Sequence, residues 1–415
     1  MRKHPFPSRL VRKSFRLAVV VSHPIQYYIP LYRRLAARTE LVVKVFFTWH
    51  AAEKPQQDPG FGREVAWDIP LTEGYDYELV ENTATKPGSD HFWGIRNRTL
   101  VRRVLEWRPD AVHITGYAYA SHLQTMRTLH RRGVPVLFRG DSHLLDQRRD
   151  WRLHVKKALL QRVYGWTSAC LFVGRHNHNY YQEMGVPEGK LFYCPHSIEV
   201  SRFADPTGEL ARQAEERRRS LQIPAKTKVL LFAAKFEPRK QPLQLMEAVV
   251  SAARDDLVLI MLGDGPLDKA IRRLASEHPS RFRVLPFQNQ SVMPVAYRLG
   301  DIFVLPSAYG ETWGLAANEA IASGRRVLLS DKVGGAPDLV RSPDIGAIFA
   351  SENWVDFHEK LNSLLAHETC PDELMLISSN YDVPETERRL LTIVKEVTHG
   401  KTSNPDLHCD DTCSK

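Results

Sequence analysis

The feature that most constrains this chain is a repeated alternation of short apolar runs with longer stretches of helical periodicity. Ten runs form two series, at 17–21, 42–47, 111–114, 134–138 and 169–173, and at 229–233, 257–262, 283–287, 302–305 and 326–330. Continuously apolar strands that alternate with helices form parallel sheets with both faces covered. Two series of five strands therefore predict an α/β chain with two doubly wound, Rossmann-like lobes.

A polar segment at 204–226 separates the two series. Residues 205–208 (Asp-Pro-Thr-Gly) form a turn pattern, and 209–221 is a charged helical stretch with few apolar positions. We predict a flexible basic arm at 1–15, a first lobe at 16–205 and a second lobe at 206–383. Pro384 indicates the start of a further amphipathic helix at 384–399, and we expect 400–415 to be a disordered tail.

Composition excludes two classes of protein. No apolar run approaches the ~20 residues of a membrane-spanning helix. The 5 cysteines are too few and too widely spaced for a disulfide framework, and a metal site at Cys409 and Cys413 lacks further ligands. We expect a cytoplasmic protein in a reducing compartment.

The charge of the chain is unevenly distributed. Residues 1–200 carry 30 Lys and Arg against 18 Asp and Glu, whereas the remaining residues carry 27 against 30. A basic half indicates an anionic partner, which charge alone leaves open: nucleic acid, a phospholipid surface or an anionic acceptor. Binding to phospholipid would place the protein at the inner face of the membrane.

The stretch 308–340 has the most informative pattern. Glu311 follows a predicted strand, and a helix is expected to begin near Gly314. In open α/β sheets ligands bind at the carboxyl ends of the strands, and the free N–H groups at Gly314 and Leu315 suit a phosphate. Glu319, further along the same helix, can accept hydrogen bonds from a ribose diol. The alternative is a solvated helix whose two glutamates face water.

These residues resemble the donor-binding region of retaining glycosyltransferases of family 4 (GT4), in which Glu311 and Glu319 match an E-x7-E motif. Lys240 matches the family's lysine in the loop 233–240, and Lys235 stands where arginine is usual. The turn 262–266, which includes Gly263, and the segment 195–203 also resemble family motifs. The similarity is strong over 225–345 and weaker over 16–205.

The resemblance implies a GT-B fold with the active site between an acceptor-side first lobe and a donor-binding second lobe, and a last helix that crosses back to the first lobe. It implies a peripheral enzyme of polysaccharide biosynthesis that transfers sugar, with retention, from a nucleotide-sugar to a glycan or lipid-linked acceptor. No metal or other cofactor is expected. In the implied donor site Lys235 and Lys240 hold the diphosphate, Glu311 the sugar and Glu319 the ribose, while Phe287 precedes two residues expected near the base.

The physical chemistry agrees with these roles, because a diphosphate leaving group brings about two negative charges and a site without metal must supply cations. Lys240 and Lys235 can do so from the end of a strand, although Lys235 lacks the two-pronged geometry of arginine. The alternative for 235–240 is a charged surface loop.

In the first lobe, the loop 22–28 follows the first strand and lacks the glycines usual in the family. We expect His23 and Gln26 to contact donor or acceptor through their side chains; alternatively, His23 caps the helix and the tyrosines pack. Tyr117 and His122 are weaker acceptor-side candidates, for which a structural role is favoured.

Three more candidates follow the strand 134–138. Asp141 and His143 are expected to position the sugar or the acceptor hydroxyl, which adds them to Glu311 and Lys240 as catalytic candidates. Arg139 is expected to hold an anionic group. A general base is not required, because the departing phosphate can take the acceptor proton.

The stretch 148–166 has apolar residues three to four positions apart, with a basic opposite side that includes Arg148 and Arg149. The apolar stripe consists of Trp151, Val155, Leu159 and Val163. Packing of the stripe on the sheet is favoured, and contact of the basic side with an anionic membrane is the alternative.

The sequence leaves several alternative functions open. The fold would also suit a glycoside phosphorylase or a nucleotide-sugar epimerase, which the family motifs disfavour. A non-catalytic nucleotide-sugar-binding subunit is the strongest rival, because glycines are missing from loop 22–28. A nucleic-acid-binding protein would fit the charge but lacks any supporting motif.

Overall fold

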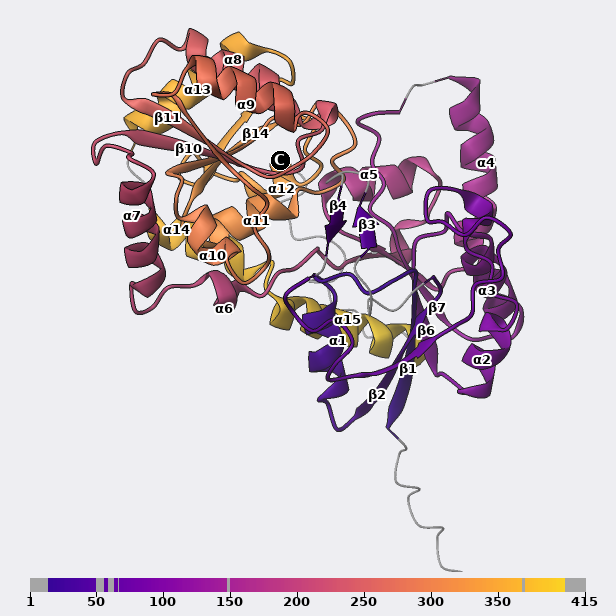
Figure 1. Cartoon of the computed structure of the whole chain (residues 1–415). Coiled ribbons are helices and arrows are strands. Elements are labelled where there is room, and N and C mark those ends of the chain that lie inside the picture. The colour runs from indigo at the N-terminus through magenta and orange to yellow at the C-terminus, as the bar shows by residue number, and fades with distance from the viewer. Residues whose placement is uncertain are drawn as a thin grey trace, which may run out of the picture.

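The computed structural model describes residues 14–49, 67–147, 150–367 and 370–399, and the backbone alone of 56–58 and 63–65. These residues form two lobes, each built on a parallel sheet (Figure 1). Nearly all of the predicted arm, the predicted tail with Cys409 and Cys413, and Arg148 and Arg149 lie outside the described residues. A short antiparallel pair, β3 (Gln56–Asp58) and β4 (Arg63–Val65), stands apart from the two sheets.

The first sheet has seven parallel strands in the order β5-β2-β1-β6-β7-β8-β9. Its strands are β1 (Phe15–Val21), β2 (Leu41–Phe47), β5 (Asp76–Leu79), β6 (Ala111–Thr115), β7 (Val136–Arg139), β8 (Ala169–Phe172) and β9 (Leu191–Tyr193). The helices of this lobe are α1 (Ile29–Ala36), α2 (Leu100–Glu106), α3 (Ala120–Arg131), α4 (Trp151–Gly165), α5 (Arg175–Glu183) and, from the end of the chain, α15 (Val383–His399).

Strand β1 shows why this sheet is buried on both faces. Val19 and Val21 point into a core formed with α1 and α15, whereas Ala18 and Val20 point into a second core formed with α2 to α5. Because side chains alternate between the faces of a strand, a continuous apolar run is what two covered faces require.

The second sheet has six parallel strands in the order β12-β11-β10-β13-β14-β15. Its strands are β10 (Lys228–Ala233), β11 (Leu257–Leu262), β12 (Phe282–Leu285), β13 (Ile302–Leu305), β14 (Arg326–Ser330) and β15 (Gly346–Phe349). The helices are α6 (Val200–Phe203), α7 (Glu209–Ser220), α8 (Pro242–Ser251), α9 (Asp268–Glu277), α10 (Met293–Tyr297), α11 (Leu315–Ala322), α12 (Ala336–Leu339), α13 (Trp354–Ala366) and α14 (Pro371–Ser379). Helices α8, α9 and α13 cover one face, and α7, α10, α11 and α14 cover the other.

The two doubly wound sheets confirm the predicted fold class. All ten predicted strands are present within two residues of their expected ends. The strands of the two large sheets that the pattern missed, β5, β9 and β15, are edge strands of three or four residues, and β5 has no fully buried position. An edge strand has one neighbour and needs no continuous apolar run, so its sequence gives a weak signal.

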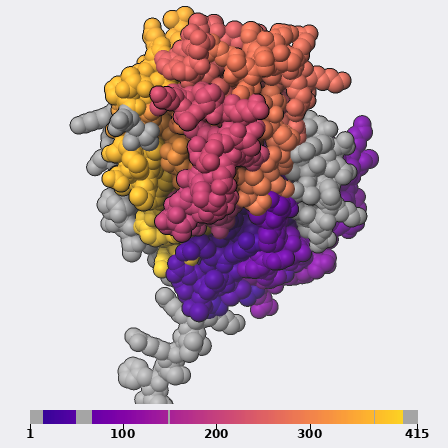
Figure 2. Space-filling model, turned by 60° about the vertical axis from the view of Figure 1, so that its left-hand side comes forward, coloured from indigo at the N-terminus to yellow at the C-terminus, as the bar shows by residue number. Residues whose placement is uncertain are grey.

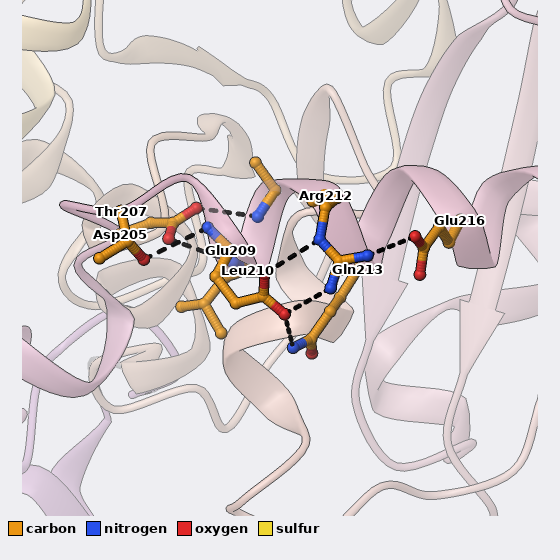
Figure 3. Close-up of polar contacts among 8 residues, drawn as sticks. Asp205, Thr207, Glu209, Leu210, Arg212, Gln213 and Glu216 are labelled. Atoms are coloured by element: carbon orange, nitrogen blue, oxygen red, sulfur yellow. Dashed lines mark hydrogen bonds and ion pairs between the residues drawn. The ribbon is translucent and has the colours of Figure 1, made fainter.

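Helix α7 holds its shape largely through its own polar contacts (Figure 3). Asp205 accepts hydrogen bonds from the backbone N–H groups of Leu210 (3.1 Å) and Ala211 (2.8 Å), which satisfies donors that the first turn leaves free. Arg212 bridges Glu209 and Glu216 on the exposed side. Only one residue of the helix, Ala214, is fully buried, which agrees with the charged helical stretch read from the sequence.

The chain crosses between the lobes twice (Figure 1), and Figure 2 shows the yellow C-terminal part of the chain beside the indigo N-terminal lobe. The first crossing comes earlier than the predicted boundary at 205, because Ile198 and Phe203 already pack in the core of the second lobe. On the return, α15 packs against α1, and the buried carboxylate of Glu387 pairs with Arg34 and Arg38, both at 2.6 Å.

The favoured prediction that the apolar stripe at 148–166 packs on the sheet is wrong for most of its residues in helix α4. The helix buries Leu160, Val163 and Tyr164 against the sheet. Three of the four predicted stripe residues face solvent instead: Trp151 is 70% exposed, Val155 60% and Leu159 61%. The prediction failed because two different apolar faces exist on this helix, and the sequence does not say which one meets the sheet.

Candidate active site

The carboxyl ends of β10 and β13, which are neighbours in the second sheet, bring Lys240 and Glu311 together. Lys240 is the last residue of a short 3-10 helix, Pro238–Lys240, and its ammonium contacts the Glu311 carboxylate. Ser307 donates a hydrogen bond to the same carboxylate at 3.2 Å. Both charged groups are largely buried, with exposed fractions of 10% and 14%.

Burial is the main perturbation of this pair and lowers the pKa of Lys240 to about 7. The positive charges of Arg239 and Lys235 lower it further, and Glu237 raises it; the Glu311 carboxylate in contact also favours the charged form. Lys235 therefore lies near Lys240, as the sequence predicted for two cations at one site. An anion placed here would hold the Lys240 ammonium in its charged form.

Two backbone loops fix the position of Glu311. The Glu311 carbonyl accepts a hydrogen bond from the N–H of Gly334 at 2.9 Å, and Arg239 donates to the Gly310 carbonyl at 3.0 Å. A Cβ atom at Gly334 would lie 2.1 Å from the carbonyl oxygen of Thr312, so only glycine allows this approach. The Gly-Gly loop thus supports the Glu311 loop.

Helix α11 begins directly after this loop. Gly314 has a φ of 96° in the left-handed region, which favours glycine, and Leu315 is the first helical residue. The N-terminal N–H groups of a helix are left without intrahelical partners and carry a partial positive charge. The helix start therefore lies near Lys240 and Glu311, as predicted for a phosphate site.

Glu319 lies one turn further along α11 and is only 2% exposed. Its Oε2 atom accepts a hydrogen bond from the Tyr297 hydroxyl at 2.6 Å, whereas Oε1 has no hydrogen-bond partner among the described residues. Burial raises the pKa of Glu319 to about 7, against the opposing effects of Tyr297, Arg202 and Tyr27. The site thus holds a buried acceptor atom that a ligand hydroxyl can satisfy.

Tyr27, which the sequence analysis did not select, reaches this site from the first lobe. Its side chain packs on the core of the second lobe, and burial together with the Glu319 carboxylate raises its pKa well above the ordinary value. The neighbouring His23 instead approaches Ser22 (2.9 Å) and the Trp49 ring, and Gln26 is half-buried in the same turn. The loop 22–28 therefore contacts the second lobe through Tyr27.

The loop after β7 meets the Glu311 loop from the first lobe. Asp141 accepts a hydrogen bond from the Thr312 hydroxyl at 3.0 Å, and Asp146 accepts one from the Gly310 N–H at 2.8 Å. Lys332, after β14, donates to the Leu145 carbonyl at 3.2 Å. We call this region, where loops 140–147, 307–314 and 331–335 meet, the interlobe junction.

His143 lies in the same loop and is 7% exposed. Its Nδ1 atom accepts a hydrogen bond from the Leu145 N–H at 3.2 Å, which places the proton on Nε2. Nε2 is buried without a partner in the described part of the chain, and burial lowers the pKa of the ring. A neutral imidazole thus presents one unused N–H donor beside the junction.

Arg139 is bound from several sides. The guanidinium is 3% exposed, donates to the Pro195 carbonyl at 3.0 Å, and lies over the Tyr28 ring. The ring of His196 stacks on Tyr28 and meets Trp313 of the second lobe. These contacts favour a role for Arg139 in holding the crossing segment over its predicted role as an anion ligand.

Tyr117 and His122 serve structural roles, which the sequence analysis favoured. Tyr117 packs in an aromatic cluster with Phe138 and Tyr164. His122 is fully buried between the Thr115 and Gly116 carbonyls and the Thr48 hydroxyl, and burial lowers its pKa to about 4.

Gly263 follows strand β11 and Phe287 follows strand β12 of the second sheet. A Cβ atom at Gly263 would lie 2.1 Å from the Ala234 carbonyl, so this turn packs directly on the loop that carries Lys235. Phe287 packs edge-on against Trp67 of the first lobe, with ring centroids 6.3 Å apart.

The sequence analysis also did not predict a contact between α12 of the second lobe and the start of α5 in the first lobe. Asp338, on α12 and 4% exposed, accepts hydrogen bonds from the Arg175 N–H at the start of α5. Gly174 precedes that N–H, and a Cβ there would lie 2.5 Å from Trp313 and 2.7 Å from Asp338. Burial raises the pKa of Asp338 to about 6.

Two searches of the described residues complete this survey. Among them, no three His, Cys, Asp or Glu side chains gather as a metal ion would need. No described helix has the length and apolarity required to span a bilayer.

Comparison with known proteins identifies the second lobe. Residues 213–381 match the family model described as glycosyl transferases group 1. The matched residues make up most of the second lobe. They include Lys240, Glu311 and Glu319, the residues on which the resemblance in the sequence was based.

Curated relatives match the same part of the chain. A D-inositol 3-phosphate glycosyltransferase of Salinispora tropica is 30% identical over 182 residues, which are 40% of this chain and 37% of that protein. The enzyme of the same name from Corynebacterium glutamicum is 34% identical over 158 residues, or 35% and 37%. The match thus spans little more than a third of these relatives.

Solved structures extend the likeness to both lobes. A glycosyltransferase from Rickettsia africae gives a TM-score of 0.70 at 13% identity and covers 94% of this chain and 100% of its own. The Anabaena protein HepE in complex with UDP gives 0.69 at 14% identity, with coverage of 92% and 100%. This likeness confirms the predicted GT-B fold.

Proposed function

We propose that this chain is a retaining glycosyltransferase that takes a sugar from a nucleotide-diphosphate donor and transfers it to a hydroxyl group. The observation that carries the proposal is the buried Lys240–Glu311 contact at adjoining strand ends, inside a glycosyltransferase group 1 domain. Burying a charge pair costs desolvation free energy that the attraction between the two charges often does not recover, so such a pair is a weak source of stability. Ionisable groups with shifted pKa values concentrate at functional sites.

In this proposal each donor group has a partner with matching chemistry. The diphosphate lies against Lys240 and Lys235, with the N-terminus of α11 at Gly314 and Leu315 adding its partial positive charge. The ribose hydroxyls donate to the Oε1 atom of Glu319, which lacks a partner among the described residues. These groups supply the positive charge by themselves, so we propose transfer without a metal ion or other cofactor.

The reaction needs one bond broken and one formed. The bond between the anomeric carbon and the phosphate oxygen breaks, and its electron pair leaves with the nucleotide diphosphate. The acceptor hydroxyl oxygen forms the new bond on the same face of the sugar, and its proton passes to the departing phosphate oxygen. Lys240 stabilises the charge that develops on the leaving group, and Glu311 holds the hydroxyls of the transferred sugar.

The first lobe contributes to the acceptor side. Asp141 lies within hydrogen-bond distance of Thr312, next to Glu311, and His143 offers an unused Nε2–H donor from the same loop. We assign these two residues to the sugar and the acceptor hydroxyl, with His23 and Gln26 at the margin. The proposed acceptor is a glycan or lipid-linked saccharide, as in polysaccharide biosynthesis, and the proposed location is the cytoplasm or the inner face of its membrane.

The known proteins support a nucleotide-sugar donor without fixing its base. HepE has been solved with UDP and with UDP and glucose, and the curated relatives act on inositol phosphate. Because the chain matches only part of those relatives, acceptor and base are best found by experiment.

The test is a thermal-shift screen with UDP, GDP, ADP, dTDP and CMP in the presence of EDTA. A nucleotide at 100 times its dissociation constant adds about 2.7 kcal/mol to the free energy of unfolding. We expect one nucleotide to raise the Tm of the wild type and of Lys226→Met, an exposed-lysine control, but not that of Lys240→Met. No shift with any nucleotide, or equal shifts in all three proteins, would refute the donor site.

A nuclear magnetic resonance spectrum of the product then decides the stereochemistry. With the matching nucleotide-sugar and a sugar acceptor, the anomeric configuration of the product should equal that of the donor. An inverted product would overturn the retaining assignment while leaving the donor site intact.

A further inference from the structure

Helix α4 exposes an apolar face that nothing in the described chain covers. Trp151, Val155 and Leu159 are 60–70% exposed. At 100° per residue they lie within one quadrant of the helix, while the buried residues Leu160 and Tyr164 lie on the opposite side and Val163 lies at the margin between the two faces. Figure 1 shows α4 at the outer edge of the first lobe.

The same face carries positive charge and no negative charge. Arg152 and Arg162 flank the apolar residues on the helix surface, and both are exposed. The guanidinium of Arg152 lies 5.7 Å from the Trp151 ring centroid. Helix α4 contains no acidic residue.

The neighbouring helix extends this surface. Helix α3 packs against α4, also lacks acidic residues, and exposes Arg127 and Arg131. An apolar patch with exposed arginines, on two helices that contain no acidic residue, matches an anionic lipid surface, in which the headgroups attract arginine and the acyl boundary accepts Trp, Val and Leu. A second copy of this chain would bring two basic faces together, which disfavours self-association.

We propose that the exposed face of α4, formed by Trp151, Arg152, Val155, Leu159 and Arg162, docks the protein on an anionic phospholipid bilayer. The other basic groups of the helix are engaged within the lobe: Lys156 lies over the Tyr180 ring, and Lys157 pairs with Glu183 at 3.1 Å. The exposed face is therefore the part of α4 available to lipid.

Docking through α4 places the bilayer beside the interlobe junction. The helix starts at its N-cap Asp150, shortly after Asp141 and Asp146, which contact the Glu311 loop. If the proposed transfer reaction is correct, an acceptor anchored in lipid would reach the junction from the membrane. The docking itself does not depend on that reaction.

The test uses flotation of the full-length protein with vesicles, without nucleotide. We expect binding to vesicles of phosphatidylglycerol and phosphatidylcholine, weaker binding as salt rises, and little binding to pure phosphatidylcholine. The charge-reversed variant Arg152→Glu/Arg162→Glu should bind at least about 30-fold more weakly, since the loss of each basic residue costs about fivefold near an anionic surface and the new carboxylates add repulsion. Trp151→Ala/Val155→Ala/Leu159→Ala should lose binding by a comparable factor.

The matched control removes three exposed apolar residues from the second lobe, Val355→Ala/Met375→Ala/Leu376→Ala, whose side chains are 65–70% exposed. It should bind vesicles as the wild type does. All variants should keep the wild-type Tm and nucleotide response, because the altered side chains lie on the surface, so a loss of vesicle binding cannot be read as loss of the donor site.

Two results would overturn the proposal. One is vesicle binding that is unchanged in both α4 variants, which would assign the lipid contact to another basic segment. The other is a wild-type dimer in solution that the apolar α4 variant converts to a monomer, which would assign the face to a second copy. Failure to bind anionic vesicles at all would refute it directly.

Discussion

The pH dependence of donor binding offers a sharp test of the site, because two of its buried groups titrate near neutrality. Burial raises the pKa of Glu319 from 4.5 to about 7 and lowers that of Lys240 from 10.5 to about 7. A ribose hydroxyl that donates to Glu319 favours the carboxylate, and a diphosphate beside Lys240 favours the ammonium. Binding should therefore release a proton from Glu319 on the acid side and take one up at Lys240 on the alkaline side.

The magnitude follows from linkage. If donor binding returns the pKa of Glu319 to its ordinary value, the affinity at pH 5.5 should be about 30-fold lower than at pH 8 from this group alone. If binding raises the pKa of Lys240 to its ordinary value, the affinity should fall by about 15-fold between pH 7 and pH 8.5. The wild type is expected to bind best close to pH 7.

The decisive change is Glu319→Gln, which keeps the shape of the side chain and removes its titration. This variant should lose the acid limb of the profile and keep the alkaline one, whereas Lys240→Met should do the reverse. The affinity of Glu319→Gln at its optimum should fall by about fivefold, since a hydrogen bond to a charged group is stronger than one to a neutral group by about 1 kcal/mol.

The assay is isothermal titration calorimetry with the nucleotide-sugar that the thermal-shift screen selects, from pH 5.5 to 8.5. The intact sugar donor is preferable to the free diphosphate, whose terminal phosphate titrates at about pH 6. Measurements at pH 6 in two buffers of different ionisation enthalpy count the protons directly. Parallel pH profiles and equal proton release in the wild type and Glu319→Gln would refute the assignment of Glu319 to the ribose.

Two further sets of variants test buried contacts, one between the lobes at Asp338 and one within the second lobe at Gly263. Asp338→Asn removes a buried acid whose pKa is raised from 3.8 to about 6, so the folded wild type binds more protons than the unfolded chain in that range. Relative to the variant, the wild type should lose about 2 kcal/mol of unfolding free energy as the pH rises from 3.8 to 6, measured by urea denaturation at each pH; a constant difference would contradict the burial argument. Gly263→Ala should lower the Tm sharply, because its Cβ would lie 2.1 Å from a backbone oxygen at a φ of 155°, whereas Gly133→Ala, with open space around it, should cost only about 1 kcal/mol. Equal melting curves for the two alanine variants would show that the turn at 262–266 can relax.

The donor side was predictable because its residues act through local geometry. Glu311 and Lys240 each follow an apolar run that ends at the same edge of one sheet, and parallel strands bring such residues together whatever the rest of the chain does. The same reasoning located Glu319, one turn along a helix whose start the glycine at 314 indicates.

Contacts between the lobes were not predictable in this way. Tyr27, Gly174 and Asp338 carry no motif, and their importance depends on how two separately folded sheets meet. Arg139 was predicted to bind an anion because it follows a strand, yet its guanidinium donates a hydrogen bond to the Pro195 carbonyl in the crossing segment. Burial of a charged group by a distant segment leaves no trace in the local pattern.

The alternation of apolar runs was enough to determine two parallel α/β sheets, because strand burial and chain direction are local properties. The tertiary structure alone decided which face of α4 meets the sheet and which remains exposed. The helix has two apolar faces of similar strength, and only the packing of Leu160, Val163 and Tyr164 on the first sheet leaves Trp151, Val155 and Leu159 in solvent. Docking of the lobes likewise set the pKa of Glu319 and Asp338, since desolvation depends on every segment that surrounds a group and not on its neighbours in sequence.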